Sequence, residues 1–362
     1  MYSIRRASVL EKMNENNVDL MVFVPGSNLA YITGHQFSPS ERLLLYCLQS
    51  NGQGSYIVPE LEKTTLNVTD DDRIFAYADE KGPHSVLQQL KKQLGLIRQI
   101  GVEEHVMRLF EWKFINELGI HQMMNGTMLL KDLRIEKDAE EIIRLRRAVQ
   151  VLEESLQATL PSIKAGKKEI EIAARLEYEM KMRGSQGTPF STIVASGSRG
   201  ALPHGRASDK VIEDGDFIVI DFGALVDGYV ADMTRTIGVG SVSKQQREVY
   251  NVVKDAITQS IRRIELGMRA CDIDAIARQI ITEAGYGVNF THRLGHGIGL
   301  DGHEDPYIAS SNEEKITSGM SFTIEPGIYI EGKFGVRIED NIVATDQGIK
   351  NLMTMDYELI IV

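Results

Sequence analysis

The 362-residue sequence predicts a two-domain protein of the mixed α/β class. This length exceeds what a single hydrophobic core usually supports. In the first part of the chain, short apolar runs alternate with helical patterns, which is typical of an α/β layer domain. The pattern changes near Lys131, after which long charged helices and glycine-rich strands follow. We therefore expect an N-terminal α/β domain over residues 1–131 and a larger α+β domain over residues 132–362.

Hydrophobic periodicity predicts the elements of the N-terminal domain. Three segments space their apolar residues at helical intervals: residues 4–16, 85–94 and 106–118. Five short apolar segments have the composition of strands: residues 20–24, 43–48, 55–58, 73–78 and 99–103. Strands of this length that alternate with helices predict a sheet with helices packed against it.

The C-terminal domain begins with helices and repeats one order of elements. Asp138 precedes a charged helical segment over residues 139–160, which Pro161 ends. Further helical patterns follow at residues 168–183, 244–266 and 272–284. Strand-rich segments come after each pair of helices, so the order helix, helix, strands occurs twice. This order suggests two similar halves, although the sequence shows no strict repeat.

Composition and charge exclude several classes of protein. Asp and Glu total 51 against 40 Lys and Arg, which gives a net charge of -11 and a pI near 5.3. Nucleic-acid binding relies on clustered basic residues, which argues against such a partner here. The apolar run at residues 20–24 is too short to span a bilayer, and two cysteines are too few for a disulfide framework. We expect a cytoplasmic protein with neither a nucleic-acid nor a membrane partner.

Two aspartates flank a predicted hairpin in the C-terminal domain. Asp221 lies within the apolar run of residues 217–223, and Asp232 begins the next strand-like segment. The turn signal Asp227-Gly228 lies close to the midpoint between them. We therefore expect a hairpin that brings the two aspartates opposite each other.

Two glutamates repeat this arrangement farther along the chain. Glu325 opens one strand-like segment, Glu339 closes another, and Gly332 is their midpoint. Directly paired residues have Cβ atoms about 4.5–5.5 Å apart. Such a spacing suits ligands that are shared between two metal ions about 3.5–4 Å apart.

Histidines join the four carboxylates as candidate site residues. His296 lies between two glycines, and His292 and His303 flank it on a backbone that permits close approach. His204 lies in a loop shortly before the strand of Asp221. Oxygen donors with one nitrogen favour Mn²⁺, Co²⁺ or Zn²⁺, and bridging carboxylates favour two ions over one. The alternative is that each acid is exposed to solvent or paired with a nearby base. This alternative would be preferred for a lone acid, but it explains two symmetric pairs of acids in apolar strands less well.

The ordered motifs resemble the pita-bread metallopeptidases, the family of methionine aminopeptidase, aminopeptidase P and prolidase. The motifs are Pro203-His204-Gly205, Ile220-Asp221-Phe222-Gly223, Asp232-Met233-Thr234-Arg235-Thr236, Gly295-His296-Gly297-Ile298-Gly299-Leu300, His303-Glu304-Asp305-Pro306, Glu325-Pro326-Gly327-Ile328-Tyr329 and Arg337-Ile338-Glu339-Asp340. They match every metal-ligand position of the family in order. The resemblance extends from about Asp132 to the C-terminus and implies a pita-bread catalytic domain with two halves related by pseudo-twofold symmetry. The N-terminal part resembles the creatinase/prolidase N-terminal domain.

The resemblance implies a role for each ligand. Asp221 would bind one metal ion, while Asp232 and Glu339 would bridge both ions. His296 and Glu325 would complete the ligands of the second ion. A water or hydroxide between the ions would attack the peptide, and Glu325 would take its proton and pass it to the leaving nitrogen. Manganese is the first choice of metal, with cobalt and zinc as alternatives.

The remaining candidates are assigned to the substrate by the same resemblance. His303 and His204 would stabilise the tetrahedral oxyanion and orient the scissile peptide. Arg337 would hold a carboxylate in place. His292 matches an extra histidine of the proline-specific members, so the expected substrate is a peptide with proline at its second position. Creatinase shares the fold but lacks this metal set, which argues against its chemistry.

The segment around Arg42 favours a dipeptidase over aminopeptidase P. Residues 31–43 resemble the corresponding loop of bacterial prolidases, which in dimers reaches the partner's active site. Arg42 would then recognise the free carboxylate of a dipeptide; the alternative is an ordinary surface arginine. We expect a homodimeric Xaa-Pro dipeptidase. The alternatives are aminopeptidase P, which acts on longer peptides, and a non-catalytic binding protein of the same fold.

Overall fold

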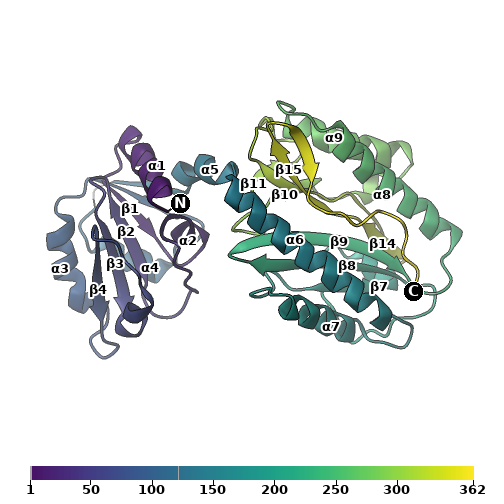
Figure 1. Ribbon diagram of the computed structural model, residues 1–362, viewed down its shortest axis with the longest axis horizontal. Helices are drawn as coiled ribbons and strands as arrows, with labels where there is room; N and C mark the ends of the chain where they lie inside the picture. The colour runs from purple at the N-terminus through teal and green to yellow at the C-terminus, as the bar shows by residue number, and fades with distance from the viewer. Residues whose placement is uncertain (1, 121) are drawn as a thin grey trace. The chain divides into compact units, whose positions relative to one another are not determined.

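A computed structural model describes residues 2–120 and 122–362. The chain forms two compact units, Met1–Arg134 and Ile135–Val362 (Figure 1). Both units mix helices and strands, as the sequence predicts. No helix within the described ranges is both long and apolar enough to cross a bilayer.

The first unit is a six-stranded mixed sheet with helices on both faces. The strand order is β4-β3-β2-β1-β5-β6. The strands are β1 (Leu20–Phe23), β2 (Leu45–Gln49), β3 (Gly54–Pro59), β4 (Asp72–Tyr77), β5 (Gln99–Val102) and β6 (Gln122–Asn125). The helices are α1 (Tyr2–Glu15), α2 (Ser27–Thr33), α3 (His84–Leu94), α4 (Leu109–Asn116) and α5 (Thr127–Ile135). The structure confirms the five predicted strands and three predicted helices and adds α2, β6 and α5.

Alternation along β1 explains why the helices divide between the two faces. Leu20 and Val22 pack in one core with α3 and α4, whereas Met21 and Phe23 pack in the other with α1, α2 and α5. Successive strand residues point to opposite faces, so a strand that is covered on both sides reads as a continuous apolar run.

The second unit consists of strands between two pairs of helices. Its first part contains α6 (Ala139–Thr159), α7 (Glu169–Met182), β7 (Ile193–Ser196), β8 (Phe217–Val226) and β9 (Tyr229–Gly238). Its second part contains α8 (Lys244–Arg263), α9 (Ala270–Glu283), β10 (Gly295–Gly297), β11 (Glu304–Ile308), β12 (Ser321–Ile324), β13 (Gly327–Ile330), β14 (Phe334–Arg337), β15 (Asp340–Thr345) and β16 (Gly348–Asn351). Figure 1 shows α7 and α9 on opposite sides of these strands. The order helix, helix, strands thus occurs twice.

Three sheets form the second unit, in the orders β7-β8-β9, β11-β10-β12-β15-β16 and β13-β14. One core lies between α6, α7 and strands β7 to β9, and the other lies beneath α8 and α9. The first helix begins where the sequence predicts, because Asp138 caps it. The Asp138 side chain accepts a hydrogen bond from the Glu141 amide at 2.9 Å, and Glu141 accepts one from the Asp138 amide at 2.9 Å.

The aspartate hairpin forms, but the predicted register is wrong. Asp221 pairs with Thr234 in the β8–β9 ladder, and Asp232 pairs with Gly223. The two-residue turn is Asp227-Gly228, with φ of 50° and 81° at its two positions. Its centre lies one residue beyond the midpoint of the two aspartates, so they become diagonal rather than direct neighbours. Diagonal side chains still share one face of the ladder.

The glutamate hairpin has the predicted register. Ile324 pairs with Asp340 between β12 and β15, and Gly327 pairs with Arg337 between β13 and β14. Glu325 and Glu339 lie opposite each other in the gap between these two ladders. The turn at Gly332 has φ of 72°, a conformation that glycine adopts at no steric cost.

Candidate active site

One cavity of about 890 Å³ collects nine of the ten predicted site residues. All nine belong to the second unit: His204, Asp221, Asp232, His292, His296, His303, Glu325, Arg337 and Glu339. They come from loops and from strands β8, β9, β10 and β14, which are far apart in the sequence. The fold therefore gathers the motifs in one place.

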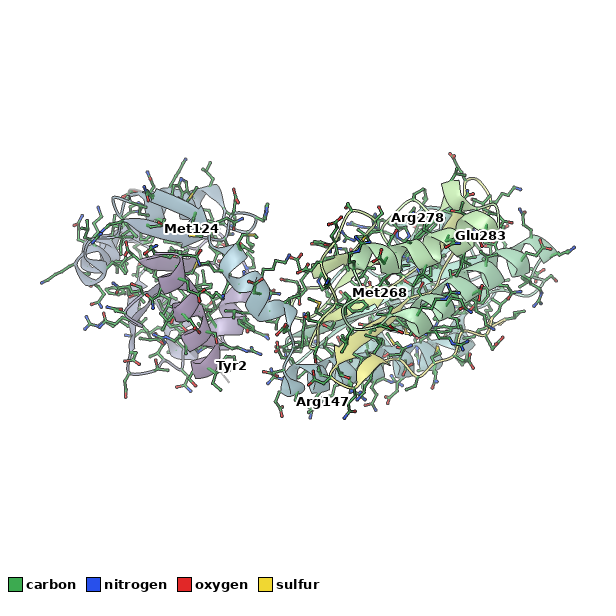
Figure 2. The ribbon with its side chains drawn as sticks, turned by 90° about the horizontal axis from the view of Figure 1, so that it is seen from above. Tyr2, Met124, Arg147, Met268, Arg278 and Glu283 are labelled. Carbon is green, nitrogen blue, oxygen red and sulfur yellow. The ribbon has the colours of Figure 1, made fainter. Side chains whose placement is uncertain are left out.

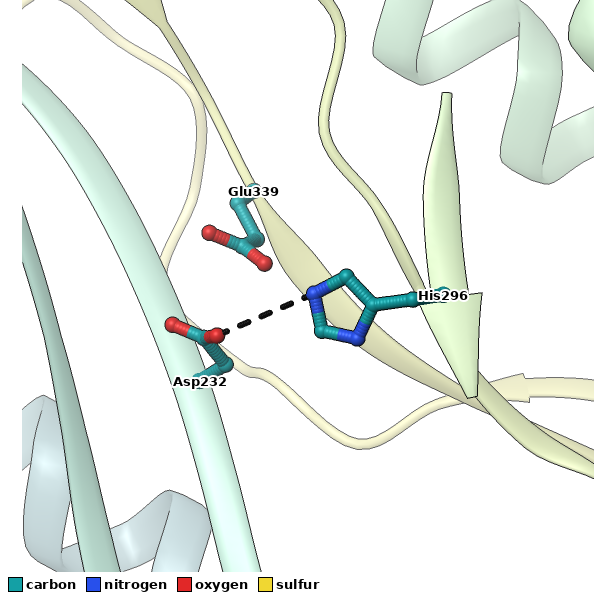
Figure 3. Close-up of side chains that lie close together, drawn as sticks. All are labelled: Asp232, His296 and Glu339. Atoms are coloured by element: carbon teal, nitrogen blue, oxygen red, sulfur yellow. Dashed lines mark ion pairs between the residues drawn. The ribbon is translucent and has the colours of Figure 1, made fainter. Parts of the chain in front are cut away.

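Asp232, His296 and Glu339 form a group whose ligand atoms lie within 4.8 Å of one another (Figure 3). The His296 Nε2 atom is 4.0 Å from Asp232 Oδ2 and 3.4 Å from Glu325 Oε1. Its Nδ1 atom lies 3.0 Å from the Gly297 carbonyl. Since a carbonyl only accepts, Nδ1 carries the proton and Nε2 presents its lone pair to the carboxylates. This orientation is typical of metal-binding histidines.

Burial keeps the His296 side chain neutral. Only 2% of the residue is exposed, and this burial lowers its pKa to about 3. A neutral imidazole is the form that binds metal ions.

Three carboxylate oxygens at this site have no hydrogen-bond partner within the described ranges. They are Asp221 Oδ1, Asp232 Oδ1 and Glu339 Oε1. Burial raises the pKa of Asp232 and of Glu339 well above the usual range, and neighbouring carboxylates raise each of them further. Burial also raises the pKa of Glu325 to about 7. Buried anions without compensation are costly, so this donor set fits divalent cations.

Arg337 is a cation that the chain itself supplies to these carboxylates. Its guanidinium forms an ion pair with Asp221 Oδ2, and its Nε donates to Thr234 Oγ1 at 3.1 Å. Thr234 in turn donates to Glu339 Oε2 at 2.7 Å. These contacts fix the second oxygen of Asp221 and of Glu339 and leave the first oxygen of each for another ligand.

A hydrogen-bonded chain connects Arg337 to His292. The Arg337 Nη1 group donates to Tyr329 Oη at 2.7 Å, and Tyr329 Oη lies 2.9 Å from His292 Nε2. The Nδ1 of His292 lies 2.7 Å from the Arg293 carbonyl and must donate to it. Tyr329 is therefore the donor to His292 Nε2. Burial lowers the pKa of His292 to about 4, so this ring is neutral.

The other two histidines are exposed at the cavity. The ring centroid of His303 lies 3.9 Å from that of His296, and partial burial lowers the pKa of His303. The His204 ring makes no hydrogen bond with any residue that the structure describes. Both rings therefore remain available to a bound molecule.

Sequence reasoning did not assign a role to Tyr329 or Arg293, which also line this cavity. Tyr329 belongs to the Glu325 motif, but only the structure reveals its contacts with His292 and Arg337. Arg293 directly follows His292 and stacks on Tyr307, with its guanidinium carbon 4.3 Å from the ring centroid. Its guanidinium has no carboxylate partner within the described ranges, and its position next to His292 was the available signal.

Arg42 is the tenth predicted residue and belongs to the first unit. Its Nε is 3.0 Å from Asp79 Oδ1, its Nη2 is 2.9 Å from Asp79 Oδ2, and its Nη1 is 2.7 Å from Glu41 Oε1. Within its unit, Arg42 is thus a partly exposed arginine that is already paired with two acids.

Buried carboxylate oxygens that lack a partner among the described residues, together with a neutral histidine, give this cavity the donors of a metal site. The sequence matches Metallopeptidase family M24 over residues 143–346 and the Creatinase/Prolidase N-terminal domain over residues 5–136. The chain therefore belongs to metallopeptidase family M24, as its resemblance to the pita-bread enzymes implied.

Relatives and solved structures extend this similarity over the whole chain. The Xaa-Pro dipeptidase of Pyrococcus horikoshii is 38% identical over 355 residues, which are 97% of each chain. The prolidase of Thermococcus sibiricus superposes with a TM-score of 0.95 at 33% identity, covering 100% of this chain and 99% of that one. The X-Pro aminopeptidase of Thermotoga maritima has a TM-score of 0.87 at 34% identity and covers 99% of both chains.

Proposed function

We propose that this metallopeptidase is an Xaa-Pro dipeptidase. The observation that carries the proposal is the cavity that unites five potential metal ligands, among them the neutral His296, with the neutral His292 and with Arg293, which forms no ion pair with a carboxylate of the described residues. The similarity to the Xaa-Pro dipeptidase of Pyrococcus horikoshii over 97% of both chains supports this choice of substrate.

We assign the metal ions to Asp221, Asp232, His296, Glu325 and Glu339. When bound, divalent ions lower the pKa of water and polarise a carbonyl. The unpartnered oxygens of Asp221, Asp232 and Glu339 support this assignment. We further propose Mn²⁺ as the ion, with Co²⁺ and Zn²⁺ as alternatives, because oxygen donors dominate the set.

The chain's own side chains divide the remaining work. The Glu325 carboxylate takes a proton from the attacking water and delivers it to the leaving proline nitrogen. His204 and His303 donate to the developing oxyanion and orient the peptide. Arg337 holds Asp221 in place through their ion pair.

Two arginines are candidates for binding the free carboxylate of a dipeptide. We propose Arg293 for this role because it lines the cavity, lies close enough to Glu325 and His303 for its charge to lower their pKa values, and forms no ion pair with a carboxylate within the described ranges. Arg42 stays a second candidate, to be supplied by the partner subunit of the proposed cytoplasmic homodimer. It would have to exchange Asp79 and Glu41 for the substrate.

Replacing Arg293 with alanine should raise KM for an Xaa-Pro dipeptide by about 10- to 100-fold, since a charged hydrogen bond is worth about 1.5–3 kcal/mol. Arg293→Lys should recover only part of this loss because lysine lacks the planar fork. Steady-state kinetics with Arg42→Ala alongside separates the two arginines. Unchanged dipeptide kinetics in Arg293→Ala would remove Arg293 from the site, and unchanged kinetics in Arg42→Ala would remove Arg42.

A paired substrate set tests the function itself. The metal-loaded protein should hydrolyse Xaa-Pro dipeptides faster than Xaa-Pro-Yaa tripeptides with the same first residue. Preference for the tripeptides would favour aminopeptidase P, an alternative that the likeness to the Thermotoga maritima enzyme supports. Absence of hydrolysis with Mn²⁺, Co²⁺ and Zn²⁺ alike would favour a binding protein of the same fold.

The metal-free protein should lose stability as pH rises from about 4.5 to about 7. In this window Glu325, with its pKa raised from 4.5 to about 7, keeps a proton in the folded state that the unfolded state has released. The unfolded state then binds fewer protons, so the free energy of unfolding falls with pH, by on the order of 3 kcal/mol. Melting temperatures measured in chelator should show this fall. The melting temperature of the metal-free Glu325→Gln variant should fall less steeply with pH. Equal slopes in the two proteins would contradict the assignment of this proton to Glu325.

A further inference from the structure

The His204 side chain takes its position from a loop and not from contacts of its own. The loop runs from Ser196, the last residue of β7, to Ser208, and it contains the short helix Gly197–Ala201. His204 is exposed, and its ring makes no hydrogen bond with any residue in the described ranges. Its place in the cavity wall therefore depends on the backbone that carries it.

A buried carboxylate, Glu169, holds both ends of this loop. Glu169 is the first residue of α7 and is fully buried. Its Oε1 accepts from the Ser196 amide at 2.7 Å and from Ser196 Oγ at 2.9 Å. Its Oε2 accepts from the Ser208 amide at 3.1 Å and from Ser208 Oγ at 2.7 Å. One side chain thus connects residues that are twelve positions apart in the sequence and that bracket His204.

Further contacts make the anchored loop rigid. Arg199 Nε donates to Glu169 Oε2 at 3.1 Å, and Arg199 Nη2 donates to the Arg206 carbonyl at 2.6 Å. In the middle of the loop, the Pro203 carbonyl accepts from Arg337 Nη1 at 3.2 Å. Glu169 therefore fixes the base of the loop, while Arg337 fixes the residue next to His204.

The chemistry at this position requires a carboxylate. All five groups that contact the Glu169 side chain are donors: two amides, two hydroxyls and one guanidinium. A carboxylate has two accepting oxygens and no proton to donate. A glutamine has the same shape, but its NH₂ group would face hydrogen-bond donors at one end of the loop. That end would lose its hydrogen bonds to the side chain.

From these contacts we propose that Glu169 is a positioning residue for catalysis, which acts by holding the loop that presents His204 to the substrate. The proposal rests on the role of His204 in the proposed hydrolysis. Glu169 itself does not line the cavity, and its side chain bonds to Ser196, Arg199 and Ser208 rather than to the proposed metal ligands.

Kinetics of Glu169→Gln, His204→Ala and the double variant test this proposal. His204→Ala should lower kcat/KM by about 10²-fold or more, as expected for a lost oxyanion donor. Glu169→Gln should lower it by about 10- to 100-fold through misplacement of the ring. The double variant should be little worse than His204→Ala, because both changes remove one function. Losses that multiply in the double variant would overturn the proposal.

Glu153→Gln is the matched control. Glu153 is also a buried glutamate of the second unit, with 9% exposure, and it accepts from the Thr354 amide and hydroxyl and from the Met355 amide at 2.6–2.8 Å. Glu153→Gln disrupts a similar hydrogen-bond network, whose donors Thr354 and Met355 lie far along the chain from the loop. This variant should keep kcat/KM within about twofold of the wild-type value. An equal loss in both glutamine variants would show a general effect on folding and overturn the proposal.

Two measurements besides activity complete the test. In protein with ¹³C-labelled histidines, Glu169→Gln should shift or broaden the His204 signal, which His204→Ala identifies by its absence among the 8 histidines. Bound metal per chain should stay unchanged. An unmoved His204 signal overturns the inference, whereas a wild-type rate in His204→Ala contradicts the proposed function of that residue. If Glu169→Gln does not fold, Ser208→Ala takes its place, because it removes one hydroxyl donor and keeps the charge of Glu169. The same measurements should then show smaller changes in the same direction.

Discussion

Replacing Glu325 with glutamine is expected to lower kcat for an Xaa-Pro dipeptide by at least about 10³-fold. Glutamine keeps the shape of the side chain and one oxygen for a metal ion, but it cannot accept a proton. General acid–base groups contribute about 10²–10⁴-fold, and here one group serves both proton transfers. The position of Glu325 supports this role, because its side chain lines the cavity beside His296.

A fall in kcat in Glu325→Gln must be distinguished from a loss of bound metal. Glu325 Oε1 lies 3.4 Å from His296 Nε2, so the substitution can also change the metal site. Metal content per chain should therefore be measured beside kcat in saturating Mn²⁺. Thr323→Ala is a useful control, since it disturbs both ligands by removing the 3.3 Å hydrogen bond to Glu325 Oε1 and the 3.1 Å hydrogen bond from the His296 amide, but keeps the Glu325 carboxylate. A Glu325→Gln variant that retains more than about a tenth of kcat would contradict the proton-transfer role.

Elements with strong periodicity could be predicted from the sequence, and three short ones could not. Helix α2 is seven residues long, too short for its apolar spacing to be distinguished from a loop. Strand β6 lies at an edge of its sheet, and the exposed Gln122 and Met123 at its start break the apolar pattern of a buried strand. The apolar pattern of a sequence reflects burial, so elements with little burial have only a weak apolar pattern.

The two carboxylate pairs show how far turn signals determine register. Gly332 is both the turn residue and the midpoint between Glu325 and Glu339, so the register of this hairpin could be predicted. For Asp221 and Asp232 the turn lies one residue past the midpoint, which makes the two side chains diagonal. The pairing of motifs could be predicted in both cases, but a shift of one residue lies within the uncertainty of a turn assignment.

Contacts between distant segments were the part of the site that sequence could not supply. Arg337 was expected to hold a carboxylate, but its contacts with Asp221 and Thr234 depend on how β14 meets β8 and β9. Glu169 gave no signal at all, because a glutamate at the start of a helix is ordinary. Only the fold reveals that its side chain turns inward to Ser196 and Ser208.

Replacing Asp232 with asparagine is expected to have opposite effects on activity and on the metal-free fold. The 5% exposed Asp232 is surrounded by the carboxylates of Glu339, Asp221 and Glu325, which together with burial raise its pKa. A neutral amide of the same size removes that repulsion and can donate to a neighbouring carboxylate. The metal-free variant should therefore be more stable than metal-free wild type at pH 7.5, by on the order of 2 kcal/mol.

The same substitution should remove at least one metal ion per chain and lower kcat/KM by at least about 10³-fold, because a ligand to the ions loses its charge. Unfolding with and without chelator, together with metal content, measures both effects. Asp274→Asn is the matched control, since Asp274 is fully buried but paired with Arg278 (Figure 2) at 2.7 Å and 2.9 Å.

Asp274→Asn should destabilise the protein equally with and without metal, because it breaks a satisfied ion pair and leaves the arginine without its anion. Asp232→Asn should instead stabilise the metal-free protein and reduce the further stabilisation that added metal gives. If Asp232→Asn destabilised the metal-free protein as Asp274→Asn does, the carboxylate of Asp232 would be serving the fold. The opposite signs expected for these two buried aspartates distinguish a charge that is kept for a cation from a charge that is already paired.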